Sequence, residues 1–119
     1  MLRKIDCVMV RVDDLATATE FYTRVFGLRR LWYDESSVGL GMPDTDAEVV
    51  LHTMSLPGDR GVHYLVDDVL AAVAAYERLG CAVREPPFDI AIGRCAVLED
   101  PFGNAVSILD MSKGPRRTA

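Results

Sequence analysis

The chain has 119 residues and half of them are hydrophobic, so it is long enough for one well-formed core and too short for two independent domains of usual size. Its formal net charge is −5, with acidic and basic residues interspersed, which gives no attraction to nucleic-acid phosphates or to anionic lipid. We therefore expect one domain that binds neither nucleic acid nor membrane.

The amino terminus, the cysteines and the tail are typical of a cytoplasmic protein. The first residues lack the apolar run of a signal peptide, and no stretch of the sequence is long enough to span a membrane. The 3 cysteines show no Cys-x-x-Cys spacing, which predicts free thiols instead of a disulfide framework. The polar residues 114–119 predict a frayed tail. We expect a cytoplasmic location.

The first half of the chain predicts one strand, one helix and three further strands. Apolar residues alternate over residues 5–12, which is typical of a strand. Asp13 and Asp14 then supply oxygen atoms and negative charge at a helix start. Helical apolar spacing continues as far as Gly27, a residue that commonly ends helices. The predicted strands that follow cover residues 29–35, 38–42 and 48–54.

The second half repeats this order. Val-Asp-Asp-Val at residues 66–69 matches Val-Asp-Asp-Leu at residues 12–15, and Gly80 stands where the second helix should end. Strands are predicted over residues 62–66, 82–86, 94–99 and 105–110. The sequence therefore predicts an α+β fold with two βαβββ modules, residues 1–56 and 60–113. Pro57-Gly58-Asp59 is the expected turn between them.

Three motifs in this order resemble the vicinal oxygen chelate superfamily, which includes glyoxalase I, extradiol dioxygenases and bleomycin-resistance proteins. They are Ile-Asp-Cys-Val at residues 5–8, the helix between Asp14 and Gly27, and Glu-Asp-Pro-Phe-Gly-Asn at residues 99–104, where Pro101 and Gly103 suit a sharp turn. The resemblance implies curved mixed sheets around one cleft, with the helices outside. The repeat predicts an internal pseudo-twofold axis, with Cys7 and Gly61 at equivalent positions of one cleft.

The resemblance also implies where a metal ion would bind. Metal-dependent members hold one divalent ion with four inward residues, and these positions fall on Cys7, His52, Gly61 and Ser107. Glycine offers no side chain and serine is a weak neutral donor, which leaves too few ligands for a tight site. We therefore predict that the chain uses no metal cofactor. The alternative is one divalent metal at a displaced site of Cys7, His52 and His63, because His63 lies on the same strand face as Gly61.

The predicted cleft is mostly apolar with a few polar groups, which is the usual composition of a ligand pocket. Its predicted ligand-binding residues are Trp32, Cys7, Met9, His52, Met54, His63, Ser107 and Leu109, with Ile5, Val50 and Leu65 beside them. The other faces of the strands place Val8, Val10, Val62, Tyr64 and Val66 under the helices. Trp32 either stacks on the ligand or packs in the core or a dimer contact. Arg29, Arg30 and Arg94 are candidate carboxylate or phosphate clamps, and Phe88 is expected in a mobile flap.

Two classes of function follow from the resemblance. The preferred one is metal-independent binding or sequestration of an apolar or aromatic small molecule, such as a natural product or an antibiotic, as bleomycin-resistance-type proteins do. The alternative is a glyoxalase-like lyase or isomerase or a dioxygenase with a displaced metal site, or a metal-free isomerase that uses His52 or His63. An accessory subunit with a vestigial cleft also remains open. Because family members are commonly dimers, we predict a homodimer.

Overall fold

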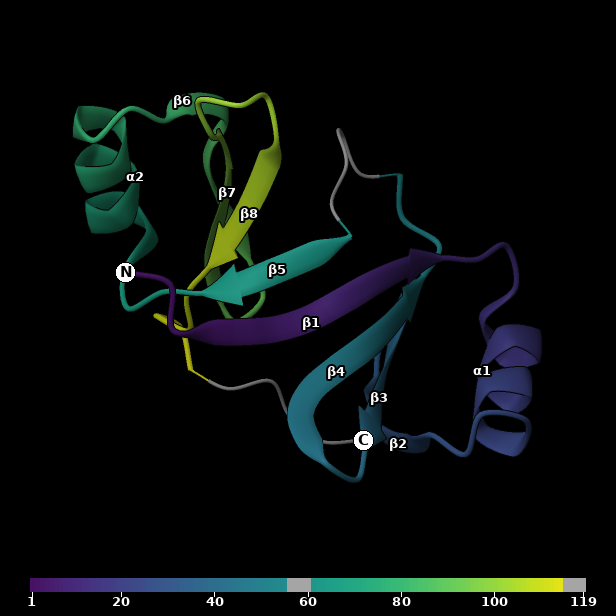
Figure 1. The fold of residues 1–119 in the computed structure, drawn as a ribbon. Helices are drawn as coiled ribbons and strands as arrows, with labels where there is room; N and C mark the ends of the chain where they lie inside the picture. Colours follow the sequence, from purple (N-terminus) through teal and green to yellow (C-terminus); the bar gives the residue numbers. More distant parts are fainter. Residues whose placement is uncertain (56–60, 115–119) are drawn as a thin grey trace. The chain divides into compact units, whose positions relative to one another are not determined.

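A computed structural model describes residues 1–55 and 61–114 (Figure 1). Within these ranges the first half forms β1 (Lys4–Arg11), α1 (Leu15–Arg24), β2 (Arg29–Tyr33), β3 (Ser37–Met42) and β4 (Thr45–His52). The second half forms β5 (Val62–Leu65), α2 (Val69–Arg78), β6 (Ala82–Ile90), β7 (Gly93–Glu99) and β8 (Ala105–Leu109). The predicted α+β class and the repeated βαβββ order are confirmed. The predicted turn at residues 57–59 and nearly all of the predicted tail lie outside the described residues.

The chain divides into two compact units that differ slightly from the predicted modules. The first unit is formed by Asp6–Gly61, whereas Met1–Ile5 belongs with Val62–Arg116 in the second. In the second unit the Arg3 amide donates to the Leu65 carbonyl at 2.8 Å, and in the first unit the Met9 amide donates to the Gly61 carbonyl at 2.6 Å. Each unit therefore includes a short segment from the other half of the sequence. The single cleft and the pseudo-twofold axis stay predictions.

Each unit has a mixed sheet with the same strand pairing (Figure 1). In the first unit β4 is parallel to β1 and antiparallel to β3, and β3 is antiparallel to β2. In the second unit β8 is parallel to β5 and antiparallel to β7, and β7 is antiparallel to β6. Parallel strands need a long connection, and in each unit the helix and two strands between the parallel partners supply it.

Both helices begin and end as their sequence signals predict. The carboxylates of Asp14 and Asp68 accept hydrogen bonds from the amides of Thr17 and Ala71, each at 3.0 Å. These contacts satisfy amides that have no partner within the helix. Gly80 follows α2 with a φ of 116°, a backbone conformation that favours glycine. Its neighbour Cys81 donates its amide to the Tyr76 carbonyl at 3.0 Å, which closes the last turn.

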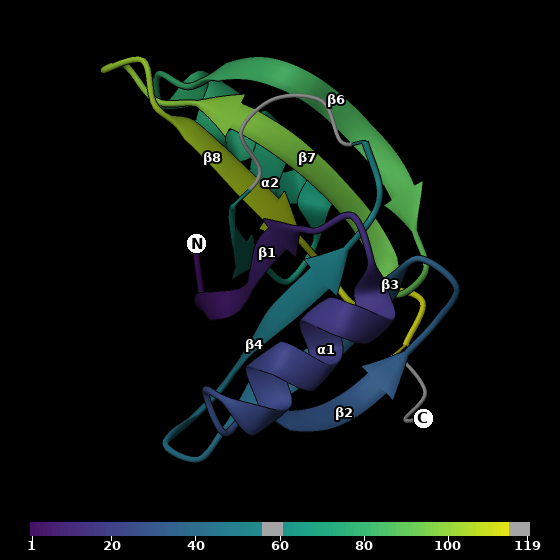
Figure 2. The ribbon, with the colours of Figure 1, turned by 90° about the vertical axis from the view of Figure 1, so that its right-hand side faces the viewer.

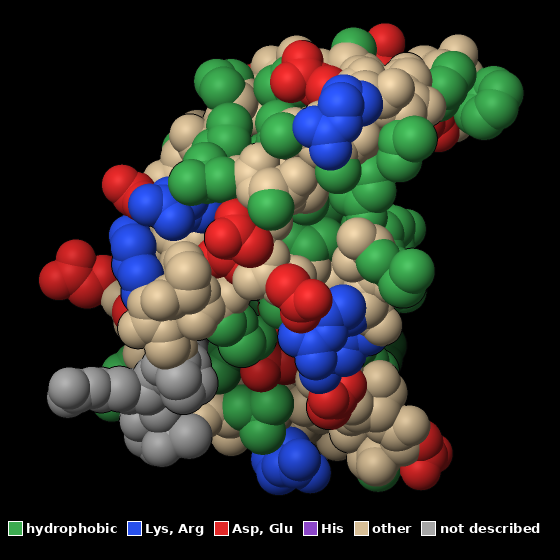
Figure 3. All heavy atoms as spheres, turned by 90° about the vertical axis from the view of Figure 1, so that its left-hand side faces the viewer, with side chains coloured by type: hydrophobic (Ala, Val, Ile, Leu, Met, Phe, Trp, Pro, Cys, Tyr) green, Lys and Arg blue, Asp and Glu red, His purple; other side chains and the backbone are tan. Residues whose placement is uncertain are grey.

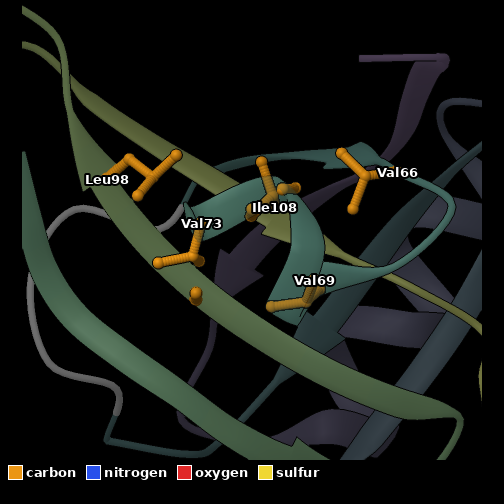
Figure 4. Close-up of a cluster of buried hydrophobic side chains, with 7 residues drawn as sticks. Val66, Val69, Val73, Leu98 and Ile108 are labelled. Carbon is orange, nitrogen blue, oxygen red and sulfur yellow. The ribbon is translucent and has the colours of Figure 1, made fainter. Parts of the chain in front are cut away.

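Each helix covers one face of the sheet in its own unit. In the first unit α1 lies over the strands (Figure 2), and Val38, Leu40 and Leu51 form the buried cluster beside it. In the second unit the side chains of Val66, Val69, Val73, Leu98 and Ile108 point toward one another between α2 and the sheet (Figure 4). These clusters confirm the predicted core positions of Val10, Tyr64 and Val66. The same prediction is wrong for Val8 and Val62, which are each 38% exposed.

The β6 strand corrects the prediction of a mobile flap at Phe88. It continues through two prolines as far as Ile90, with irregular pairing between Glu85 and Phe88. Phe88 then pairs with Cys95 of β7, and its ring packs on a buried cluster of the second unit. Proline is tolerated in a strand that pairs on one side, because its missing amide is then not needed for the ladder.

The motif at residues 99–104 forms the turn between β7 and β8. One carboxylate oxygen of Asp100 accepts from the amides of Phe102 and Asn104, at 2.8 and 2.9 Å. These bonds, with those from the Asn104 side chain, lower the pKa of the Asp100 carboxyl. Gly103 has a φ of 89°, and Arg84 donates to its carbonyl at 3.0 Å. The predicted structural role of this motif is confirmed.

The surface and the helix lengths agree with the composition. Acidic and basic side chains are interspersed with hydrophobic ones on the face shown in Figure 3. The two helices have 10 residues each, and neither α1 nor α2 is long and apolar enough to cross a membrane.

Within the described residues Cys7, Cys81 and Cys95 form no disulfide bond, as predicted.

Candidate functional site

The sheet of the first unit has a second face, turned away from α1, which we name the Trp32 face. Successive side chains of a strand point to opposite faces, and directly paired residues share a face. Because Val38 and Leu51 pack toward α1, the residues that alternate with them lie on the Trp32 face. They are Cys7, Met9 and Arg11 on β1, Trp32 on β2, Ser37, Gly39 and Gly41 on β3, and Glu48, Val50 and His52 on β4. The structure thus brings four predicted site residues to one face of one sheet.

Trp32 is buried in this face and is held there in two ways. Its side chain is 7% exposed and packs with Cys7 and Val50. The ring lies directly on Gly39, where an added Cβ would stand 2.0 Å from the indole nitrogen. The indole N–H donates to a carboxylate oxygen of Glu48 at 2.7 Å. Trp32 therefore packs in this cluster and orients an acidic side chain.

The register of β1 and β4 identifies Glu48 as the acidic neighbour of Cys7. Cys7 pairs directly with Glu48, whereas His52 pairs with Arg11. Cys7 and His52 are therefore separated by four residues along the parallel strands, or about 13 Å at the usual strand rise. Glu48 was not predicted as a site residue, because in sequence it follows Asp44 and Asp46 and has the pattern of a solvated acidic segment. Only the strand register reveals its position.

His52 ends β4 in a buried polar environment. Its side chain is 5% exposed, and the directly paired Ser37 of β3 is 4% exposed. Burial lowers the pKa of the His52 imidazole, and the positive charge of Arg11 lowers it further, while the Met54 backbone opposes both effects. The imidazole is therefore neutral at pH 7. A neutral imidazole has one nitrogen that donates a hydrogen bond and one that accepts.

The second unit places three more predicted site residues together. Ser107 of β8 pairs with His63 of β5, and Leu109 pairs with Leu65. All four residues are at most 7% exposed, and they lie on the face away from α2. Leu65 and Leu109 pack there with Cys95 of β7. This face thus combines one polar pair with an apolar cluster.

The other predicted residues have less central positions. Met9 packs against the Trp32 cluster, and Met54 is half-buried beyond the end of β4. Ile5 is 45% exposed. Among the candidate clamps, Arg30 lies over the Tyr33 ring at 5.0 Å and the Arg94 side chain is 3.9 Å from the Asp89 carboxylate. Both cations therefore already have partners within the chain.

Known structures with this fold are numerous, and the following ones have low sequence identity to this chain. Methylmalonyl-CoA epimerase from Streptomyces coelicolor, in complex with 2-nitronate-propionyl-CoA, has 17% identity and a TM-score of 0.73, with 98% of this chain and 100% of that one covered. The epimerase from Mycobacterium tuberculosis has 17% identity and a TM-score of 0.77, covering 93% and 89%. A hypothetical protein from Bacillus halodurans C-125 has 13% identity and a TM-score of 0.75, covering 96% and 98%. At these identities the likeness shows the fold.

The family model for the Glyoxalase/Bleomycin resistance protein/Dioxygenase superfamily matches residues 4–108. The chain belongs to this superfamily. No curated protein sequence matches it closely enough to add a narrower assignment. Membership confirms the resemblance drawn from the sequence motifs and covers both βαβββ units.

The four family positions for a divalent ion do not fit such an ion in this superfamily member. Gly61 has no side chain, and Ser107 is a weak neutral donor. The two better ligands, Cys7 and His52, are about 13 Å apart along the strands, whereas ligands of one zinc ion lie roughly 2 Å from it. Within residues 1–55 and 61–114, no group of three or more His, Cys, Asp or Glu side chains is gathered as a metal site.

Proposed function

We propose that the chain binds an apolar or aromatic small molecule without a metal ion. The observation that supports this proposal is the composition of the Trp32 face, where Glu48 and His52 lie among the apolar side chains of Met9, Val50 and Trp32. Small-molecule sites typically combine an apolar lining with a few fixed polar groups. Burial of apolar ligand surface would supply affinity, and the polar groups would select the orientation. Natural products and antibiotics are the ligand classes that we favour.

Fluorescence of Trp32 provides the test, because the chain contains 1 tryptophan. The purified protein is titrated with a panel of aromatic compounds, with and without a chelator. We expect at least one compound to change the emission saturably, with the same affinity in both conditions. A matched calorimetric titration of the Trp32→Phe variant measures binding without using Trp32 fluorescence. It therefore shows whether the compound binds when the tryptophan is absent. Affinity that disappears with the chelator would contradict the proposal.

A second candidate is a metal-free isomerase. It is favoured by His52, whose buried and neutral imidazole is suited to accept a proton near pH 7. The epimerases that share the fold act on acyl-CoA compounds, but a net charge of −5 offers no general attraction for such anions. Incubation with methylmalonyl-CoA in D2O distinguishes the candidates. If the unmodified protein exchanges the substrate C–H hydrogen for deuterium and the His52→Gln variant does not, the result would favour the enzyme over the binding protein.

We also propose that the chain forms a homodimer. Within their units β2 pairs only with β3 and β6 pairs only with β7 among the described strands, so each has one ladder side available. Exposed strand edges are commonly covered in stable proteins, and a second copy would do this. Sedimentation equilibrium at micromolar concentration should give twice the chain mass of 13.1 kDa. A monomer under these conditions would refute the dimer and leave the binding proposal standing.

A further inference from the structure

The buried imidazole of His52 has an unused hydrogen-bonding atom. Its side chain is 5% exposed, and its Nδ1 has no hydrogen-bond partner among residues 1–55 and 61–114. Native proteins rarely leave a buried polar atom without a partner, because such an atom has lost its hydrogen bonds to water. A group outside the described residues is therefore expected at this nitrogen.

The neighbours of His52 determine which kind of group fits. Ser37 is buried directly beside it on β3, and its hydroxyl already donates to a carboxylate oxygen of Asp34 at 2.7 Å. The remaining lone pairs of the Ser37 oxygen can only accept hydrogen bonds. On the other side is Arg11 of β1, whose guanidinium donates to the carbonyl of Val12 and to the carboxylate of Asp13. In the tautomer with the proton on Nε2, Nδ1 of His52 is also an acceptor, and two buried acceptors then lie together.

We propose that Nδ1 of His52, with Ser37 beside it, accepts a hydrogen bond from a neutral hydroxyl or amide N–H group of the bound molecule. This inference rests on the proposed binding function and narrows its ligands to aromatic compounds with a neutral donor group, such as phenols and anilides. A cationic donor fits poorly, because Arg11, the residue paired with His52 on β1, already places a positive charge on the same face of the sheet.

Phenol and toluene test this inference, because they are close in size and only phenol has a donor. Each is titrated into protein labelled with ¹⁵N at histidine, and affinity and the Nδ1 chemical shift are followed by NMR. Phenol should bind about fivefold more tightly, the ratio expected for a net hydrogen bond of about 1 kcal/mol. Phenol, and not toluene, should shift the Nδ1 resonance of His52.

Variants of His52 and one control complete the test. In His52→Phe the preference should reverse, because the phenol hydroxyl would be buried without a partner. If that variant does not fold, His52→Asn, with a side-chain amide close to the position of Nδ1, should keep the preference for phenol. Thr19→Val is the matched control, since Thr19 Oγ1 is another buried atom without a partner in the described chain and lies on α1. It should leave the preference unchanged.

The outcomes separate this inference from the proposed function. Equal affinities for the two probes, or tighter binding of toluene by the unmodified protein, would overturn the role of His52 while leaving aromatic binding intact. If phenol does not shift the Nδ1 resonance, the proposed role of His52 is likewise overturned. A permanently bound water would then be the hydrogen-bond partner of the nitrogen. Failure of both probes to bind at millimolar concentration would count against the proposed function and this inference together.

Discussion

At the scale of single residues, the Trp32 face depends on the absence of a side chain at Gly39. The indole ring occupies the space where a Cβ would be, so Trp32 can lie against Gly39 and donate a hydrogen bond to Glu48. This close approach fixes three things together: the position of the ring, the burial of the Cys7 cluster and the orientation of the Glu48 carboxylate. The φ of Gly39 is not positive, so backbone conformation does not require glycine at this position. Glycine is required because a side chain would overlap the indole ring.

The effect of a substitution at Gly39 on the free energy of unfolding should depend strongly on the residue at position 32. Gly39→Ala should destabilise the protein by roughly 2–4 kcal/mol, because the new methyl group overlaps the indole ring and displaces it. In the Trp32→Ala background the same substitution should cost less than about 1 kcal/mol, since the obstructing ring is gone. Denaturant unfolding of the four proteins in the cycle measures this. Additive free energies would contradict the packing described here.

Asp110 is a second residue on which the fold depends. It follows β8, is fully buried, and accepts hydrogen bonds from the amides of Val69 and Arg94 at 2.8 and 2.9 Å. Burial raises the pKa of its carboxyl, but these bonds and those from Ser112 outweigh burial and lower it overall. The carboxylate thereby connects the first turn of α2 to β7.

This environment predicts acid sensitivity below about pH 4. The folded state holds the pKa of Asp110 below the unfolded value of about 3.9, so its contribution is complete above that pH and is lost as pH falls further. Asp110→Asn should cost about 1–3 kcal/mol at pH 7, because an amide oxygen replaces only one of two charged acceptors. It should also flatten the acid side of the stability curve. An unchanged pH profile in the variant would contradict this role.

At the scale of elements, the two helices are alike in sequence pattern and differ in burial. In α2 the side chains of Val69, Ala72 and Val73 are buried, whereas no side chain of α1 is. Both have an aspartate at the start, so capping does not distinguish them. Because helix stability in proteins comes mostly from packing of the apolar face, α1 is the less firmly held of the two.

Hydrogen exchange should show this difference. The amides of α1 should exchange about 10-fold or more faster than those of α2, corresponding to a difference in opening free energy of at least about 1.4 kcal/mol. NMR or mass-spectrometric exchange at neutral pH measures it residue by residue. Leu40→Ala, in the cluster beside α1, should accelerate exchange in α1 first. Equal protection of both helices would contradict the assignment.

The elements could be predicted from sequence because their signals are local. Aspartates, helix-ending glycines and apolar alternation lie within a few residues of the boundaries that they define. The site could be predicted only in part. Cys7 and Met9 share a face because alternation along one strand is a local property, whereas the family resemblance was needed to place His52 on the same face. The positions of Glu48 and Asp110 depend on which residues pair across strands and on contacts between distant segments, and no local pattern carries this information.

At the scale of the whole molecule, we expect metal content to be low. The purified protein should carry nickel, zinc, iron or manganese well below one ion per chain, because the family positions do not provide enough ligands close together. Binding of aromatic compounds should survive a chelator. Elemental analysis of the unmodified protein and of His52→Ala and His63→Ala measures this. A full equivalent of metal, lost in either variant, would favour the displaced-site enzyme instead.

Each compact unit includes a short segment from the other half of the sequence, which affects whether either half can fold alone. Met1–Ile5 completes the unit formed by the second half, and Gly61 completes the unit formed by the first. A chain cut in its linker would therefore yield two fragments, each without a segment that its own unit uses. Neither fragment should fold alone, whereas the mixture should reassemble by complementation. Each unit in this sense depends on the other half of the sequence, and unfolding of the two should be a single cooperative event.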